Sequence, residues 1–417
     1  MMGQIKRGGN LDPGKAAACR RKEIPDSRKR VLVTASVASM VDLFFMENIR
    51  ILCGQGWQVD VAANFYAGNI TNQKRVAQFR RELTRMGITV YDVPVPRKIT
   101  DVRNIVRAYR VLKRICMQNK YGLLHTQSPI GGAVSRLAAK KSRKYGTKVI
   151  YTAHGFHFYK GAPFYQWLLF YPAERWLSRY TDFLLTINQE DFLRAKAFPA
   201  GRVFYVPGIG VDLEAFRFRS EMRDRMRKTF GFTEKEFVVL SVGQLSKRKN
   251  QETVIRAMAL VKNQAVRYVV VGLGEYRHRY RDLVRRLGLE KKVVLAGYRG
   301  DVRDVLQMAD CFAFPSRQEG LPAALMEAMA AGVPAVCSRV RGNRDLIRDG
   351  IDGILLESDD VYGFAGAIER LAAHPQLADR YQASAGKRVA AFSKKRVCRQ
   401  MERIYEMAGG KNGDGME

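Results

Sequence analysis

Two glutamates lie eight positions apart in an otherwise apolar segment, EGLPAALME (319–327). The strand-like run CFAFPS (311–316) precedes it, and Pro322 suits the first turn of a helix, where a residue without an N–H is tolerated. The predicted helix is apolar nearly all round, so a buried Glu327 needs hydrogen-bond partners. The vicinal hydroxyls of a ribose would satisfy this carboxylate, while amides at the helix start bind a phosphate nearby. The alternative is that Glu319 caps a turn and Glu327 is solvated.

A basic segment predicts a second part of such a site. Gly243 ends the strand-like run FVVLSVG (237–243) and lets the chain turn, and three consecutive cations, KRK (247–249), precede a helix that Asn250 opens. Cations beside a helix N-terminus, at the carboxyl end of a strand, predict a diphosphate site. A solvated basic turn is the alternative.

The elements that would position these residues follow a regular order. Short β-branched runs alternate with amphipathic stretches, which predicts two tandem Rossmann-like, doubly wound α/β domains. Ligands of such sheets bind outside the carboxyl ends of the strands, so the loops after the strands should carry the chemistry. The predicted strands are 30–35, 58–64, 88–95, 122–128, 148–155 and 182–188 in the first domain, and 237–243, 266–272, 292–297, 311–316, 334–340 and 353–358 in the second.

The join between the two domains is predicted in VPGIGVD (206–212), where turn-forming residues follow a strand. The first 29 residues are basic and rich in Gly and polar residues, as is typical of a disordered leader. The expected organisation is a leader (1–29), a first Rossmann-like domain (30–206), a second Rossmann-like domain (207–388), a C-terminal helix packing back toward the first domain (389–408) and a tail (409–417).

The net charge is the compositional outlier. The 417 residues include 72 Lys and Arg against 40 Asp and Glu, a formal charge of +32. This implies a polyanionic neighbour: nucleic acid, an anionic membrane or a phosphorylated substrate. No apolar run of about 20 residues predicts a membrane span, and the leader lacks the apolar region of a secretory signal, so we expect a cytosolic protein. Six scattered cysteines without CxxC spacing predict reduced thiols and no zinc site.

The order of motifs in the second half resembles the family 4 retaining glycosyltransferases, which use nucleotide sugars and have the two-Rossmann-domain GT-B fold. The first half is similar to bacterial members that build exopolysaccharide or capsule, and the resemblance covers roughly residues 30 to 405. The motifs that carry it are SVGQLSKRKN (241–250), VVVGLGE (269–275), VVLAGY (293–298) and FPSRQEGLPAALMEAMAAGVPAV (314–336), with ASVASMVDLFFMENIRIL (35–52), HTQSPIGGAVSRLAAKK (125–141) and YTAHGFHFYKGAP (151–163) in the first half.

The resemblance implies roles for individual residues. Glu319 would contact hydroxyls of the transferred sugar, Glu327 would hold the nucleotide ribose, and Lys249 would bind the diphosphate. His154 matches the active-site histidine beside the sugar ring, although a lone histidine after a strand is more often structural. The implied catalytic residues are thus His154, Lys249 and Glu319, and the other implied nucleotide-sugar-binding residues are Gly243, Gln244, Arg248, Gly272, Tyr298, Gly320, Leu321, Pro322 and Glu327.

The sequence departs from the family pattern at two loops. Gln244 stands where the family usually has an arginine, and either Arg248 or Lys247 could substitute for that charge. The loop SVASM (36–40) lacks the common Gly-Gly pair, so its serines would approach the ligand with side chains. The acceptor-side residues expected are therefore Ser36, Ser39 and, as a weaker candidate, His157, while His125 lies within a strand and shapes the loop.

The implied reaction is sugar transfer with retention of configuration, in which cations and helix amides stabilise the leaving diphosphate. No convincing DxD motif is present, so no metal and no other cofactor is expected. A UDP-sugar is expected as donor because it is the family's commonest. The expected acceptor is a lipid-linked saccharide at the inner face of the cell membrane, and the sequence does not identify the sugar, the acceptor or the linkage.

Three other functions are weighed against this one. The first is an NAD-linked oxidoreductase, because VGLGEYR (271–277) partly matches a dinucleotide fingerprint. Arg277 stands in place of the third glycine, however, and no acidic residue closes the next strand. A non-hydrolysing sugar-nucleotide epimerase shares the fold, and the basic, aromatic first domain and the paired glutamates argue against it. A basic nucleic-acid-binding protein would explain the charge, but no recognised signature interleaves aromatics with the cations, so no nucleic-acid partner is expected.

Two segments of the first domain predict contact with an anionic membrane. In residues 101–120, four arginines fall on one stripe of a helix and apolar residues line the other side. The segment 155–176 is dense in aromatic residues with flanking cations. The alternative is a solvated basic helix and an aromatic core. The arginines expected to face the membrane are Arg103, Arg107, Arg110 and Arg114.

Overall fold

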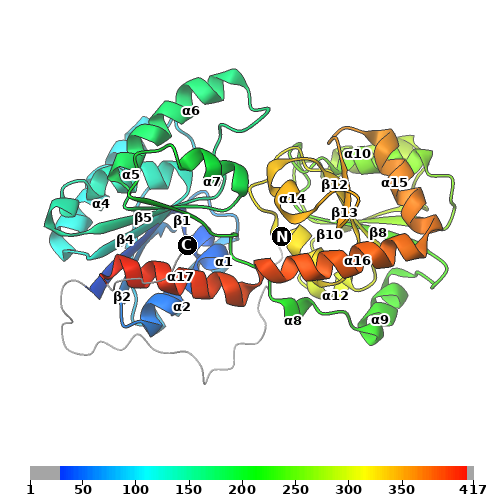
Figure 1. The fold of residues 1–417 in the computed structure, drawn as a ribbon, viewed down its shortest axis with the longest axis horizontal. Coiled ribbons are helices and arrows are strands. Elements are labelled where there is room, and N and C mark those ends of the chain that lie inside the picture. The colour runs from blue at the N-terminus through cyan, green and yellow to red at the C-terminus, as the bar shows by residue number, and fades with distance from the viewer. Residues whose placement is uncertain (1–28, 411–417) are drawn as a thin grey trace. The chain divides into compact units, whose positions relative to one another are not determined.

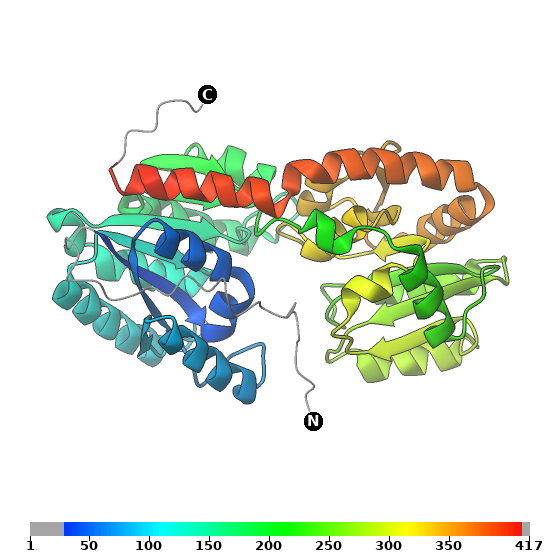
Figure 2. The same cartoon turned by 90° about the horizontal axis from the view of Figure 1, so that it is seen from below.

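The computed structural model describes residues 29–410, and these residues form two compact units. The first unit contains residues 29–209 and 397–410, and the second contains residues 210–396. Each unit is built on one parallel sheet with helices on both faces (Figures 1 and 2). Of the predicted leader and tail, residues 1–28 and 411–417 lie outside the described residues.

The sheet of the first unit has seven parallel strands in the order β3-β2-β1-β4-β5-β6-β7. All six predicted strands are present, and β7 is an additional strand at the edge of the sheet. The side chains of β1 are almost all buried, as expected for a strand covered on both faces. The strands are β1 (Arg30–Val37), β2 (Gln58–Asn64), β3 (Thr89–Asp92), β4 (Leu123–Gln127), β5 (Lys148–Ala153), β6 (Phe183–Thr186) and β7 (Arg202–Tyr205).

Alternate residues of β1 belong to different cores, because successive side chains point to opposite faces of the sheet. Val31 and Val33 pack with α1, α2, α3 and α17, while Leu32 packs with α4 and α5. A third, aromatic cluster joins α6 and α7 to the sheet. These helices are α1 (Ala38–Phe44), α2 (Met46–Gly54), α3 (Gln73–Arg85), α4 (Val102–Asn119), α5 (Pro129–Ala139), α6 (Phe164–Leu177), α7 (Gln189–Ala195) and α17 (Lys394–Ala408).

The sheet of the second unit has six parallel strands in the order β10-β9-β8-β11-β12-β13, and all six were predicted. Its two faces are covered by separate hydrophobic clusters, one with α10, α11 and α15, the other with α9, α12, α13 and α16. The strands are β8 (Phe237–Val242), β9 (Val266–Val271), β10 (Val293–Gly297), β11 (Cys311–Phe314), β12 (Ala335–Ser338) and β13 (Gly353–Leu356). The helices are α8 (Leu213–Phe216), α9 (Ser220–Phe230), α10 (Gln251–Leu260), α11 (Arg277–Arg286), α12 (Val302–Leu306), α13 (Ala323–Ala330), α14 (Arg341–Leu346), α15 (Val361–Ala373) and α16 (Pro375–Val389).

Both sheets reverse their strand order at one place, between β1 and β4 in the first unit and between β8 and β11 in the second. Such a switch point opens a crevice at the carboxyl ends of the two strands, because the loops that follow them turn to opposite faces. The predicted doubly wound fold is therefore confirmed for both units. The loop after β8 contains the basic segment. The loop after β11 contains Glu319 and leads into α13, which carries Glu327.

The loops after β8 and β9 approach each other through their backbones. Gly272 has φ +150°, and a Cβ atom at this position would lie 1.8 Å from the carbonyl oxygen of Gly243. The amide of Gly243 donates to the carbonyl of Val271, which fixes the start of the β8 loop. Only glycine fits at position 272, because any side chain would push the two loops apart.

We predict that Gly272→Ala lowers the free energy of unfolding by about 2 kcal/mol or more, through a strained φ and the backbone clash. Chemical denaturation of the full chain measures this change. Gly366→Ala is the matched control: Gly366 is exposed inside α15 and its Cβ would meet nothing within 4 Å. This control should stabilise the protein by about 0.5 to 1 kcal/mol. Equal effects of the two substitutions would contradict the close approach.

Candidate functional site

At the switch point of the second unit, the loops after β8 and β11 are joined by an ion pair. Lys249 Nζ lies 2.7 Å from Glu319 Oε1, and Arg248 Nη1 lies 3.0 Å from the same oxygen. The side chain of Glu319 is 7% exposed and that of Lys249 is 13% exposed. The structure thus brings together two of the three residues predicted to be catalytic, 70 positions apart in sequence.

Lys249 is held from two sides. Its ammonium lies 4.6 Å from the ring centre of Phe314, the last residue of β11, as well as against Glu319. Burial lowers the pKa of Lys249, and the Glu319 carboxylate acts in the opposite direction. A partly desolvated cation is strongly attracted to any further negative charge that reaches it.

Glu327 lies on α13, directly after the Glu319 loop, and is 7% exposed, as its apolar surroundings in sequence predicted. Pro322 is the N-cap residue of this helix instead of lying in its first turn as expected. The Glu319 loop is also fixed by its backbone, since Arg341 Nε donates to the carbonyl of Glu319. A Cβ on Gly342 would lie 2.3 Å from the carbonyl oxygen of Gly320, so α14 packs against the loop with no room for a side chain.

The three consecutive cations of the β8 loop differ in their contacts. Lys249 and Arg248 turn toward Glu319, whereas Lys247 lines a separate polar cavity of about 240 Å³. Arg279 and Arg317 also line this cavity. Within residues 29–410 no ion pair joins Lys247 to Glu319, and a role for all three cations at a diphosphate stays a prediction.

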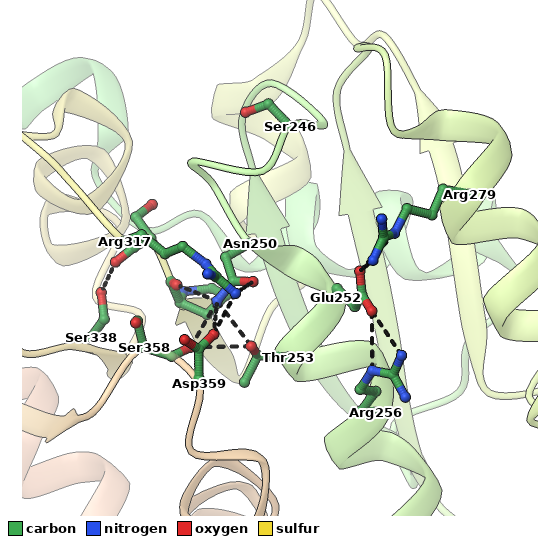
Figure 3. A network of polar contacts seen from close by, with 12 residues as sticks. Ser246, Asn250, Glu252, Thr253, Arg256, Arg279, Arg317, Ser338, Ser358 and Asp359 are labelled. Carbon is green, nitrogen blue, oxygen red and sulfur yellow. Dashed lines mark hydrogen bonds and ion pairs between the residues drawn. The ribbon is translucent and has the colours of Figure 1, made fainter.

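Asn250 begins α10 as predicted, but its side chain does not cap the helix. The residue has φ +55°, in the left-handed region, and its amide Nδ2 instead lies 2.8 Å from the carbonyl of Ser358 and 3.1 Å from Asp359 Oδ1. Arg317 Nη2 lies 2.6 Å from the same Asp359 oxygen (Figure 3). This network ties together the loops that follow β8, β11 and β13.

Other predicted nucleotide-side residues lie at the carboxyl ends of neighbouring strands. Gln244 follows β8 and is exposed, Gly272 follows β9, and Tyr298 follows β10 and is half-buried. Gly320 and Leu321 belong to the Glu319 loop. These positions agree with a ligand lying along the ends of β8 to β11.

In the first unit, His154 follows β5 and contacts a side chain that sequence analysis missed. Its Nε2 lies 2.8 Å from Oε1 of Gln127, the last residue of β4. Both residues line a small cavity of about 20 Å³, together with Thr152, Phe44 and Phe45. The available signal was position: parallel pairing places Gln127, the last residue of β4, opposite Thr152 near the end of β5, and His154 follows two residues later.

His125, predicted to shape a loop, lies beneath this cavity in a buried hydrogen-bonded chain. Its Nδ1 lies 2.9 Å from the hydroxyl of Tyr405 on α17, and its Nε2 lies 2.8 Å from Thr152 Oγ1. Burial is the main cause that lowers the pKa of His125 to about 3, with a smaller effect of His154. The C-terminal helix is therefore linked to the floor of the His154 cavity.

Burial also lowers the pKa of His154 to about 4, so its ring is neutral at pH 7. With the Oε1 atom of Gln127 facing the ring, this oxygen accepts from His154 Nε2, which then carries the proton of the neutral ring. This tautomer leaves Nδ1 as an acceptor.

The predicted acceptor-side serines are engaged within the first unit. Ser36 Oγ lies 2.7 Å from Ser128 Oγ across the switch point, and Ser39 Oγ accepts from the amide of Ile70 at 2.9 Å. His157 packs against Phe170 of α6, with 4.7 Å between ring centres. The serines thus fix the loops after β1 and β2.

Comparison with known proteins assigns the family. A model of the glycosyl transferases group 1 matches residues 222–388, and a model of the glycosyl transferase 4-like domain matches residues 43–208. EpsD of Bacillus subtilis (strain 168), a candidate glycosyltransferase, is 37% identical over 382 residues, which cover 90% of this chain and 96% of that protein. The chain belongs to this glycosyltransferase family. The resemblance found in its motifs is confirmed.

Two further relatives extend the comparison for this glycosyltransferase. The UDP-Gal:alpha-D-GlcNAc-diphosphoundecaprenol alpha-1,3-galactosyltransferase of Escherichia coli is 29% identical over 287 residues, covering 66% of this chain and 71% of that protein. The crystal structure of Anabaena HepE with UDP and glucose has a TM-score of 0.71 at 19% identity, covering 91% of this chain and 99% of that chain. That similarity shows the fold, and the predicted GT-B class is confirmed.

The lowered pKa values of His125 and His154 predict how stability depends on pH. Their folded pKa values, about 3 and about 4, lie below the 6.5 of an unperturbed histidine, so below about pH 6.5 the unfolded state binds protons that the folded state does not. Stability should therefore fall as the pH is lowered from about 6.5 to about 4. Each histidine contributes a slope of up to about 1.4 kcal/mol per pH unit.

Chemical denaturation across this pH range measures the slope. His154→Gln should reduce this slope by the contribution of one histidine. Equal slopes for wild type and His154→Gln would show that His154 is not held neutral in the folded protein.

Proposed function

We propose that this glycosyltransferase transfers a sugar from a nucleotide sugar, with UDP as the nucleotide, to a lipid-linked saccharide in exopolysaccharide, capsule or related polysaccharide synthesis. The reaction retains the anomeric configuration and needs no metal. The single observation that carries the proposal is the Lys249–Glu319 pair at the switch point of the second unit. The E. coli relative named for UDP-Gal and a diphosphoundecaprenol acceptor, and the UDP bound to HepE, support the donor and acceptor classes.

The pair has unused hydrogen-bonding capacity on both partners. An ammonium has three N–H donors, and Glu319 takes one of them, so two remain for phosphate oxygens. Among residues 29–410, the hydrogen bonds to the Glu319 side chain all go to Oε1. Oε2 is thus available to accept from a sugar hydroxyl. A diphosphate and a sugar could bind side by side without breaking the ion pair.

The proposed chemistry is electrostatic. As the bond to the sugar breaks, negative charge accumulates on the leaving diphosphate, and the partly desolvated Lys249 stabilises it. Arg248, which shares Glu319 with Lys249, would replace the charge of the family arginine at Gln244, because it already lies against the Lys249–Glu319 pair. His154 would accept from a sugar hydroxyl through Nδ1.

The proposed place of action is the inner face of the cell membrane. Arg103, Arg107, Arg110 and Arg114 are exposed on α4, and within residues 29–410 none of them forms a salt bridge. An exposed basic stripe of this kind is attracted to anionic headgroups. Across the described residues, no helix has the length and apolar character needed to span a bilayer. We assign the acceptor side to the loops held by Ser36 and Ser39 and to His157, and propose no nucleic-acid partner.

We predict that Glu327→Gln weakens binding of free UDP by about tenfold or more. The substitution keeps the shape of the side chain but removes charge-assisted hydrogen bonds to the ribose, worth roughly 1.5 to 3 kcal/mol. Titration calorimetry with UDP measures the change. Glu319→Gln is the comparison: it should lower turnover more than it lowers UDP affinity. If the folded Glu327→Gln protein binds UDP as tightly as the wild type, Glu327 does not hold the ribose.

We also predict that Lys249→Ala lowers kcat on the order of 100-fold, because it removes charge stabilisation from the leaving group. Lys247→Ala is the matched control, since this cation of the same loop forms no ion pair with Glu319 within residues 29–410, and its kcat should stay near the wild-type value. Transfer of radiolabelled sugar to membrane lipid measures both. Excess EDTA should not affect the reaction; loss of activity that magnesium restores would overturn the metal-free mechanism.

A further inference from the structure

Helix α6 carries the largest run of exposed apolar side chains on the first unit. Phe164 is 79% exposed, Tyr165 63%, Leu168 69%, Leu169 53% and Trp176 45%. Such values are unusual, because large apolar side chains on a soluble protein are rarely exposed together. In Figure 1 α6 lies at the outer edge of the helical layer of its unit.

These side chains form one continuous face. The exposed positions recur at spacings of one and four residues, which places them on a single side of a helix. Arg175, seven positions after Leu168, is the one charged residue of α6 on this side, near the end of the helix. We call this surface the outer face of α6; its residues are Phe164, Tyr165, Leu168, Leu169, Pro172, Ala173 and Trp176.

The opposite side of α6 is packed, so the helix is fixed in orientation. Trp167 and Tyr171 lie against Phe158 in the aromatic cluster of the first unit. Glu174, the one acidic residue of α6, turns inward and pairs with the fully buried Arg136 at 2.7 Å. The predicted aromatic segment is therefore both a core and an exposed apolar surface, and its acid is neutralised on the inner side.

Cations surround the outer face. Lys160 precedes the helix, and Arg175 and Arg179 lie at its end, all exposed. In the same layer, α6 contacts α5 and α5 contacts α4, which carries the exposed arginine stripe. An uncharged apolar face with basic residues at its margins is the pattern of a helix that lies in a membrane interface.

We propose that the outer face of α6 enters the interfacial layer of an anionic bilayer. The helix has 14 residues, about 21 Å of length, which is too short to cross a hydrocarbon core of about 30 Å, so it lies along the surface. A second copy of the chain is a less suitable occupant, because pairing two such faces would bring two sets of cations together. The inference rests on the proposed function in one respect: the lipid-linked acceptor would lie in the same bilayer that α6 enters.

Insertion and electrostatic attraction differ in their response to salt. The attraction of the α4 arginines to headgroups is screened, with a Debye length of about 3 Å at 1 M salt. Burial of the outer face of α6 in the acyl boundary is not screened. Part of the vesicle binding should therefore persist in high salt, and this part should depend on α6.

The tryptophans allow insertion to be observed directly. The chain has three, Trp57, Trp167 and Trp176, and the last two are on α6. Trp57 is 5% exposed in the sheet core, so Trp57→Phe leaves only α6 reporters. This variant is mixed with vesicles of equal parts phosphatidylcholine and phosphatidylglycerol whose acyl chains carry bromine. Emission should shift to the blue and be quenched by the bromines, and the quenching should persist in 1 M salt.

Variants on α6 and α4 separate the two contributions. Leu168→Ser with Leu169→Ser should abolish the quenching and lower binding in high salt by about tenfold or more. The matched control, Ile351→Ser with Tyr362→Ser, removes equally exposed apolar side chains from the second unit and should change neither. Replacing the four α4 arginines by Gln should lower binding at low salt while the quenching of bound protein remains.

If the protein sediments with the vesicles but its tryptophan emission is not quenched, the arginines alone hold it on the membrane. This result would overturn the insertion of α6. A dimer in solution that the α6 double variant dissociates would assign the outer face to a second copy and overturn it as well. Sugar transfer to a detergent-dispersed acceptor separates this failure from failure of the proposed function, because the α6 variants should keep that activity even where they lose vesicle binding.

Discussion

The ion pair between Lys249 and Glu319 is the interaction around which the functional loops of the second unit are arranged. Both side chains are largely removed from water, so each charge would be costly without the other. The pair joins the loop after β8 to the loop after β11, where the strand order reverses. Under the proposed function, a diphosphate bound there would meet a cation and a carboxylate already fixed relative to each other, so little reorganisation would be needed as charge develops.

The backbone around this pair holds it in place without help from a ligand. Asn250 uses its amide to bind the loop after β13 instead of capping α10, and Arg317 binds Asp359 from the loop after β11. On the other side, the contact between Gly272 and Gly243 leaves no space between two loops. With its positive φ, Asn250 presents its amide to the loops after β11 and β13, where it donates to the carbonyls of Pro315 and Ser358.

The sheets could be predicted from the sequence because buried parallel strands give repeated β-branched runs, and every predicted strand is present. Strand β7 was missed because it is short, lies at the sheet edge and buries its side chains only partly. The partner of Glu319 could not be predicted in the same way. Three adjacent cations carry the same charge, and their sequence alone does not show that Lys249 and Arg248 are the two that pair with Glu319. Gln127 was missed because its contact with His154 depends on strand pairing and not on a motif.

The net charge of +32 could be matched by nucleic acid or by an anionic membrane, and the surface of the first unit helps to choose between them. Arg136 is buried and paired with Glu174, whereas the α4 arginines are exposed and form no salt bridge within residues 29–410. Nucleic acid would pair with those arginines through its phosphates, but it would leave the outer face of α6 in water. An anionic bilayer accommodates both features, because headgroups pair with the arginines and the acyl boundary receives the apolar face. The two surfaces together therefore favour a membrane over a polynucleotide.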